Sequence, residues 1–299
     1  MKQKVSVIIP TYKSGETLIR AVDSVLEQTY KNIEVVVVDD NSPGTQYRLK
    51  TEQLMDKYSS DNRVIYIKHK ENRNGSAARN TAFSYSSGDY IAFLDDDDYY
   101  LPNKLSNQVD FLNSHTELGG CYCWRLDKGK NVCGTYEGDF SYELLSLEFT
   151  PYTSAIMIRR QCYEALNGFD ETYRRHQDFE FLLRFFEKYK LGFVPSVDLV
   201  LSSNGVNNTP KGDAFVKVKE HFFNNFSNTI NRVTQNDKVK KKIIYANHFS
   251  DLFKDLIRYG YPFLAFRVYF KYGRLGGLKF WQLFFSKCFS GLKERFQKL

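Results

Sequence analysis

The sequence predicts an α/β fold, in which helices flank a mixed sheet and a helical extension follows at the C-terminal end. Short β-branched runs alternate with amphipathic helical stretches over about the first hundred residues. Acidic or polar turns close several of these runs, and beyond residue 213 the pattern is helical. The length of 299 residues suits one large domain with an appendage.

The first part of the chain alternates strands with helices. Runs rich in valine and isoleucine predict strands at 5–9, 33–38, 64–67 and 90–94. Apolar residues at helical spacing predict helices at 15–28, 46–58 and 76–85. Four strands joined by helices favour parallel pairing with right-handed crossovers.

The rest of the chain is less regular and predicts a mixed sheet followed by helices. A helix is expected at 102–113, and short strands at 120–125, 132–136 and 154–158. After a turn at 167–171, helical spacing resumes near Asp178. A polar segment at 204–213 separates two predicted domains, 1–205 and 214–299. Helices are expected in the second domain at 215–233, at 239–259 and from Lys279 onward.

Polar side chains follow three of the predicted strands at the point where each strand ends. Thr11 and Tyr12 follow the first strand, Asp39 and Asp40 the second, and the run 95–98 the fourth. Ligands of such sheets bind at the carboxyl ends of the strands, so these residues are expected to share one cleft. An acidic rim with one aromatic ring suits a base, a ribose and a metal-bound diphosphate.

The four consecutive aspartates at 95–98 indicate a cation site. Adjacent carboxylates repel one another, and a divalent ion relieves that repulsion. Side chains two residues apart in an extended chain point the same way, so Asp95 and Asp97 can face one ion. Oxygen ligands favour Mg²⁺ or Mn²⁺. The alternative is an acidic turn before a helix that has Pro102 in its first turn.

Several other functions lack their sequence signatures. The first strand is followed by Pro10-Thr11-Tyr12-Lys13-Ser14-Gly15, which is no glycine-rich dinucleotide cradle, and no Walker lysine motif occurs. These absences argue against a nicotinamide enzyme and a P-loop ATPase. The five cysteines suit reduced thiols, since Cys121, Cys123 and Cys133 lack a fourth zinc ligand at a familiar spacing.

Two further acids, Asp178 and Glu180, fall in the first turn of a predicted helix. A carboxylate there can cap the helix or complement its dipole, worth roughly 0.3–2 kcal/mol. A catalytic role is the other interpretation, and the local sequence leaves both open.

With these residues in view, the chain resembles the inverting glycosyltransferases of family 2, over residues 4–203. The motifs that carry the resemblance are Val5 to Tyr12, Gln28-Thr29-Tyr30, Glu34 to Ser42, Ala78-Arg79-Asn80, Phe93 to Asp98, Leu166 to Glu171 and Gln177 to Glu180. The resemblance implies an A-type glycosyltransferase fold with a Rossmann-like sheet. It also implies transfer of a sugar from a nucleotide diphosphate sugar, with UDP as the expected nucleotide.

The resemblance also implies roles for individual residues. Asp40 would hydrogen-bond the nucleobase, and Arg79 would lie near the phosphates. Asp178 would be the catalytic base, with Glu180 in reserve. The remaining donor-site residues implied in this way are Pro10, Thr11, Tyr12, Asp95 and Asp96. The metal would be held by Asp97 and Asp95, although an acid at position 96 departs from the family pattern and leaves Asp98 open as the direct ligand instead of Asp97.

The implied acceptor is a hydroxyl of a glycan or of a lipid-linked intermediate in bacterial surface-polysaccharide synthesis. Two other functions are weighed against this one. A sugar-phosphate nucleotidyltransferase would need a glycine-rich loop with a basic residue after the first strand, which is missing here. A non-catalytic binding scaffold would be expected to lack the base or the metal motif, and both are present.

The C-terminal fifty residues hold the whole cationic excess, ten Lys or Arg against three acids, and fourteen aromatic residues. On a helix from Lys279 one face would carry Trp281, Phe284, Phe285, Cys288, Phe289, Leu292, Phe296 and Leu299. No apolar run approaches the roughly eighteen residues of a membrane span. We expect this region to lie on an anionic membrane surface, with packing onto the protein or a homodimer as alternatives and no nucleic acid partner. The N-terminus shows no signal peptide, so the expected location is cytoplasmic, at the inner face of the cell membrane.

Overall fold

The computed structural model describes residues 3–202, 210–235 and 237–296, with side chains as far as residue 289. The chain divides into two compact units. One comprises Met1–Phe140 and Pro151–Val206, and the other Ser141–Thr150 and Asn207–Leu299. The polar segment predicted to separate two domains, 204–213, lies mostly outside the described residues.

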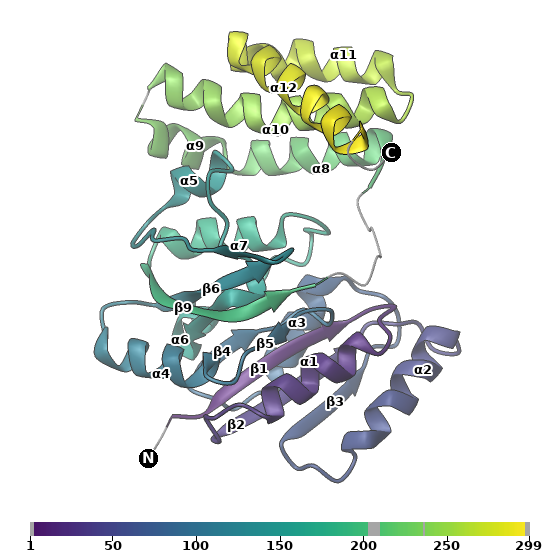
Figure 1. Cartoon of the computed structure of the whole chain (residues 1–299), viewed down its shortest axis with the longest axis vertical. Helices are drawn as coiled ribbons and strands as arrows, with labels where there is room; N and C mark the ends of the chain where they lie inside the picture. Colours follow the sequence, from purple (N-terminus) through teal and green to yellow (C-terminus); the bar gives the residue numbers. More distant parts are fainter. Residues whose placement is uncertain (1–2, 203–209, 236, 297–299) are drawn as a thin grey trace. The chain divides into compact units, whose positions relative to one another are not determined.

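The first unit is built on one mixed sheet (Figure 1) with the strand order β3-β2-β1-β4-β8-β6-β9-β5, with β7 paired to β6. The strands are β1 Val5–Thr11, β2 Ile33–Asp39, β3 Val64–Lys68, β4 Tyr90–Phe93, β5 Tyr99–Tyr100, β6 Gly120–Asp127, β7 Lys130–Val132, β8 Ile156–Arg159 and β9 Leu191–Leu201. Its longer helices are α1 Thr17–Leu26, α2 Gln46–Met55, α3 Gly75–Ser84, α4 Lys104–Ser114 and α7 Gln177–Phe186, and α6 Arg160–Ala165 is short.

The parallel half of the sheet consists of β3, β2, β1 and β4, as the sequence predicts. The valines and isoleucines of β1 and β2 are buried, because helices cover both faces of these strands. In Figure 1, α1 lies in front of the sheet and α3 behind it. The chain runs outward from β1 through β2 to β3 and then returns to β4 on the other side of β1. The strand order therefore reverses between β1 and β4, which is where such sheets bind ligands.

The other half of the sheet is mixed. β8 pairs antiparallel with β4 and β6, while β9 runs parallel to β6 and antiparallel to β5. The strand β9 was not predicted, because Pro195, Ser196 and Asp198 interrupt its apolar pattern. The strand expected at 132–136 is wrong beyond Val132, where β7 ends. The one expected at 154–158 begins at Ile156, because a 3₁₀ turn, Thr153–Ala155, precedes it.

The second unit is helical. It contains α5 Ser141–Leu145, α8 Gly212–Asn225, α9 Ser227–Thr234, α10 Lys238–Arg258, α11 Pro262–Lys271 and α12 Gly277–Phe296. The helix predicted at 215–233 is divided at Phe226, and α5 enters this unit from an earlier part of the chain. Phe253 of α10 is a core residue, with ring contacts to Phe280 at 5.6 Å and to Phe284 at 5.2 Å. None of the described helices combines the length and the apolar character needed to cross a membrane.

Candidate active site

The acidic run begins where β4 ends, beside the end of β1. The Leu94 amide donates to the Ile8 carbonyl at 3.0 Å, and the Tyr12 amide donates to Asp96 Oδ2 at 3.2 Å. The two strands at the reversal of strand order thus place the acidic run next to Tyr12. Burial is the largest cause that raises the pKa of Asp96, to about 7, and the neighbouring carboxylates of Asp97 and Asp95 add to it.

Asp98 is turned into the protein. The Ser154 hydroxyl donates to Asp98 Oδ2 at 2.7 Å, and the Ser202 amide donates to Asp98 Oδ1 at 3.0 Å. Burial raises the pKa of Asp98 to about 8. The side chain of Asp95, by contrast, is 44% exposed. The Asp95 side chain is therefore accessible to solvent, whereas the hydrogen bonds of Asp98 link the end of β4 to the segment before β8 and to the end of β9.

No group of three metal-ligating side chains occurs among the described residues. A site built from one or two carboxylates still fits Mg²⁺ or Mn²⁺, since these ions retain waters and complete their coordination with substrate phosphates. The acidic run provides such a donor set, because the Asp95 carboxylate is exposed and Asp97 lies two residues further along the chain. Asp97 is partly buried, and Arg20 Nη2 donates to its backbone carbonyl at 2.7 Å.

Arg79 joins the acidic run to the start of α7. From α3, where it is buried, it donates through Nη2 to Asp95 Oδ1 at 2.6 Å and through Nη1 to Gln177 Oε1 at 2.9 Å. A planar guanidinium can hold two partners in a fixed geometry. Gln177 immediately precedes Asp178, so this fork brings together the residues predicted for the phosphates, the metal and the catalytic base.

Asp178 lies in the first turn of α7, as predicted. Burial is the largest cause that raises its pKa, and Asp95 acts in the same direction, while Arg79 lowers it. A buried carboxylate with a raised pKa is a stronger base once ionised, which suits proton abstraction. His176, just before α7, has a left-handed backbone with φ 59°, so the chain turns sharply into this helix.

Glu180, the reserve candidate for the base, is buried in a structural ion pair. Arg184 Nη2 donates to Glu180 Oε2 at 2.8 Å, and the same guanidinium donates to the carbonyls of Leu166 at 2.7 Å and Gly168 at 2.9 Å. The pair thereby fixes the turn at 166–171 against α7. This environment favours Asp178 over Glu180 as the reactive carboxylate.

Asp40 accepts four hydrogen bonds and is almost fully buried. Oδ1 accepts hydrogen bonds from His69 Nδ1 at 2.8 Å and from the Arg73 amide at 2.8 Å. Oδ2 accepts hydrogen bonds from Asn72 Nδ2 at 2.8 Å and from the Asn74 amide at 2.9 Å. The carboxylate thus anchors the loop that leads into α3. The contact of Asp40 with the nucleobase stays a prediction. The loop residues that donate to the Asp40 carboxylate were not among the predicted site residues.

Asp39 is also directed inward. Its carboxylate forms an ion pair with Arg48 at 2.9 Å and accepts a hydrogen bond from the Tyr66 hydroxyl at 2.7 Å. Asp39, the last residue of β2, and Asp40, which follows it, therefore stabilise neighbouring loops. Neither directs its oxygens to solvent in the way that Asp95 does.

Pro10, Thr11 and Tyr12 lie together at the end of β1, as predicted. Thr11 is buried, and the Tyr12 ring is partly exposed beneath Lys13, whose Nζ lies 4.9 Å from the ring centroid. The Lys13 amide donates to Asn41 Oδ1 at 2.9 Å, which ties this turn to the segment after β2. An aromatic face next to a cation suits a nucleotide, and Lys13 was not predicted as a site residue.

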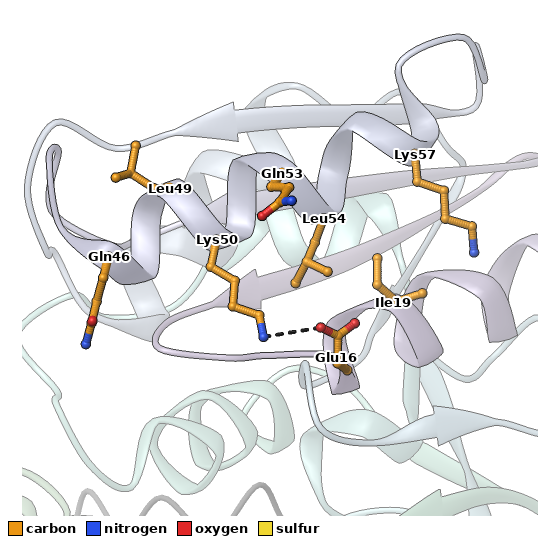
Figure 2. Close-up of a pocket in the computed structure, with 8 residues that line it drawn as sticks. All are labelled: Glu16, Ile19, Gln46, Leu49, Lys50, Gln53, Leu54 and Lys57. Carbon is orange, nitrogen blue, oxygen red and sulfur yellow. Dashed lines mark ion pairs between the residues drawn. The ribbon is translucent and has the colours of Figure 1, made fainter.

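A separate open groove lies between α1 and α2 (Figure 2), lined by Glu16, Ile19, Gln46, Leu49, Lys50, Gln53, Leu54 and Lys57. Glu16 and Lys50 form an ion pair across it at 3.2 Å. The groove contains none of the predicted site residues, and ordinary helix surface side chains line it. The predicted site residues lie instead at the carboxyl ends of β1, β2 and β4, in α3 and at the start of α7.

The sequence profile of glycosyl transferase family 2 matches residues 6–196. The chain belongs to this family. Membership accounts for the sheet and for the order of the motifs along it, and the family is one of glycosyltransferases, the enzyme class that the sequence predicts. It gives no support to the nucleotidyltransferase or to the non-catalytic scaffold.

Curated relatives share parts of the sequence. The chain is 41% identical over 132 residues to the Escherichia coli UDP-Glc:alpha-D-GlcNAc-diphosphoundecaprenol beta-1,3-glucosyltransferase WfaP, covering 44% of this chain and 50% of WfaP. It is 30% identical over 202 residues to the amylovoran biosynthesis glycosyltransferase AmsB of Erwinia amylovora, covering 63% of this chain and 64% of AmsB. The matches thus span half to about two thirds of these relatives.

Among solved structures, S. aureus TarS 1-349 in complex with UDP-GlcNAc has a similar fold. The TM-score is 0.63 with 18% sequence identity, and the similarity covers 86% of this chain and 73% of that one. The A-type glycosyltransferase fold predicted from the sequence, with its mixed sheet and helical C-terminal region, is confirmed.

Proposed function

We propose that this glycosyltransferase moves a sugar from a UDP-sugar to a hydroxyl of a glycan or lipid-linked acceptor, with inversion, in the synthesis of a bacterial surface polysaccharide. The Arg79 fork carries the proposal. It joins an exposed carboxylate of the acidic run to the helix turn that bears Asp178. The residues proposed as the phosphate-binding cation, a metal ligand and the partly buried base are thereby linked at the reversal of strand order, where a nucleotide would bind.

In this mechanism Asp178 accepts the proton of the acceptor hydroxyl while the hydroxyl oxygen attacks the anomeric carbon. The bond from that carbon to the diphosphate breaks on the opposite face, and the nucleotide leaves as the diphosphate anion. Arg79 would stabilise the charge on that anion; its ion pair with Asp95 of the acidic run supports this role. Pro10, Thr11 and Tyr12 are the proposed wall of the nucleoside pocket.

A divalent cation, Mn²⁺ or Mg²⁺, is proposed at Asp97 and Asp95, where it would neutralise charge on the leaving diphosphate. Asp97 is preferred to Asp98 as the direct ligand, because both Asp98 oxygens already accept hydrogen bonds. Asp96 would then contact the donor from beside Tyr12. The relatives support the donor and acceptor classes, since WfaP is a glucosyltransferase for UDP-Glc and alpha-D-GlcNAc-diphosphoundecaprenol.

The C-terminal region, 214–299, is proposed to hold the enzyme at the inner face of the cell membrane, where a lipid-linked acceptor is available. The cationic excess of the last fifty residues supports this role. A homodimer through the same region is the second possibility.

The function is tested by measuring UDP release from a panel of UDP-sugars, with lipid-linked glycan acceptors, in Mn²⁺, in Mg²⁺ and after chelation. Asp178→Asn should lower kcat at least a hundredfold and leave the Kd for UDP within about threefold, because the base acts on the acceptor. Glu187→Gln, an exposed acid at the end of the same helix, is the matched control. Near-normal turnover of Asp178→Asn would remove Asp178 from the mechanism.

A further inference from the structure

The amphipathic stripe predicted for the last helix is divided in two by the structure. Trp281 and Phe284 pack against Phe253 of α10, with ring centroids 5.7 and 5.2 Å apart, so this part of the stripe belongs to the helical core. Phe285 and Phe289 are exposed. Of the other predicted stripe residues, Cys288 is partly buried. The side chains of Leu292, Phe296 and Leu299 lie outside the described part of the chain.

A second exposed apolar face occurs on α11, which the sequence pattern did not single out. Phe263, Phe266 and Phe270 repeat at three- and four-residue intervals and so share one side of the helix. Phe263 is 92% exposed and Phe270 is 63% exposed, whereas Ala265 and Val268 on the opposite side are buried. Exposed phenylalanines at helical spacing indicate a surface that another body covers.

The exposed faces of α11 and α12 are connected through aromatic rings. Tyr269 lies 5.5 Å from Phe270 and 4.9 Å from Trp281, which in turn lies 6.1 Å from Phe285. The Trp281 indole also donates to the Tyr269 hydroxyl at 3.1 Å. Leu278, on the α12 side, is 82% exposed. We call this set the aromatic ridge: Phe263, Phe266, Phe270, Leu278, Phe285 and Phe289.

Basic side chains occur in the same segment of the chain as the aromatic ridge. Arg258, Arg274 and Lys279 are exposed and take part in no ion pair among the described residues. Arg267 and Lys271, on α11, pair with Asp213 and Glu220 at 3.1 and 2.9 Å. The net charge of the last fifty residues is positive, with ten basic and three acidic side chains. A surface that combines phenylalanines with unpaired cations is complementary to anionic lipid head groups over an acyl interior.

We propose that the aromatic ridge inserts into the interface of an anionic phospholipid bilayer, with Arg258, Arg274 and Lys279 at the level of the phosphates. A second copy of the chain is the other occupant with matching apolar character, but like charges on the two copies would oppose it. The inference builds on the proposed activity toward a lipid-linked acceptor, yet its test needs no turnover. Either claim can therefore fail without the other.

The test is flotation of the full-length protein with vesicles of phosphatidylcholine alone and of phosphatidylcholine with phosphatidylglycerol, at low and high salt. The wild type should float with the anionic vesicles and be released in part by salt. Phe263→Ser/Phe270→Ser/Phe289→Ser should reduce its partition at least tenfold in both salts. Arg274→Gln/Lys279→Gln should reduce it only at low salt.

The matched control is Leu49→Ser/Tyr85→Ser, which replaces exposed apolar residues of the first unit. It should float like the wild type, and all variants should keep the wild-type denaturation midpoint, because every replaced side chain is exposed. Flotation of the triple variant at the wild-type level would overturn the proposal. So would a wild-type dimer that ignores vesicles and dissociates in the triple variant, since the ridge would then be a protein interface.

Discussion

Asp40→Asn distinguishes an anchoring role for Asp40 from a direct contact with the nucleobase. The substitution keeps the shape of the side chain but replaces one carboxylate oxygen by an NH₂ group. The oxygen of the asparagine can take the place of Oδ2 and keep the Asn72 side chain and the Asn74 amide. The NH₂ group then faces His69 and the Arg73 amide, both of which serve the carboxylate as donors.

The size of the effect follows from these four donors. His69 can change its tautomer and accept from the new NH₂ group, since Thr81 Oγ1 lies 2.9 Å from its Nε2 and can accept a hydrogen bond from Nε2–H. The Arg73 amide has no such option, and losing its partly buried hydrogen bond costs about 1 kcal/mol. The other three bonds lose their charge assistance, a few tenths to about 1 kcal/mol each. Asp40→Asn should therefore lower the free energy of unfolding by about 2–4 kcal/mol.

The assay is chemical denaturation, followed by titration of UDP into the folded variant. Glu71→Gln, an exposed acid in the same segment, is the control and should change neither quantity. The anchoring role predicts a lower denaturation midpoint at an unchanged m value. An unchanged midpoint together with a large loss of UDP affinity would refute this reasoning and support the nucleobase contact.

Two further predictions concern the start of α7 and its link to the acidic run. Burial raises the pKa of Asp178 in the folded protein above its ordinary value of 3.8. Between the unfolded-state pKa and the folded-state pKa, the folded protein therefore binds more protons than the unfolded chain. The free energy of unfolding falls as the pH rises through this interval. Asp178→Asn removes that pH dependence, so the melting temperature of the variant should match that of the wild type near pH 3.5 and exceed it near pH 8. Equal melting temperatures at both pH values would contradict a raised pKa of this carboxyl group. In Arg79→Lys the side chain keeps its charge but cannot bind Asp95 and Gln177 at the same time, so kcat should fall about ten- to a hundredfold with little change in stability. A wild-type kcat would show that the two hydrogen bonds of Arg79 do not position the site.

The parallel half of the sheet could be predicted from the sequence because its strands are buried on both faces. The runs at β1 and β2 are almost uninterrupted in valine and isoleucine, so their period and their boundaries are evident. β9 lacks this signal, since it carries polar residues and a register shift opposite Trp124. Its place in the sheet depends on pairing with β6 and β5, which a local pattern cannot reveal.

The candidate site, like the sheet, could be predicted from the sequence only in part. The acidic run and Asp178 are visible as local motifs, but Arg79 donates to Gln177, which lies 98 positions further along the sequence. The four donors around Asp40 come from a loop about thirty residues later, so its burial could not be inferred from its position after β2. Sequence motifs identify which residues carry the chemistry, whereas the structure decides which of them face the ligand.

The final helix illustrates why a helical stripe does not reveal its own partner. Periodicity placed Trp281, Phe284 and Phe285 on one face, and the competing explanations were packing and membrane contact. Both apply to different parts of that face, because Phe253 of α10 covers Trp281 and Phe284 but leaves Phe285 exposed. The strongest exposed signal, Phe263, lies on a neighbouring helix. An exposed surface assembled from two helices can be recognised only once their packing is known.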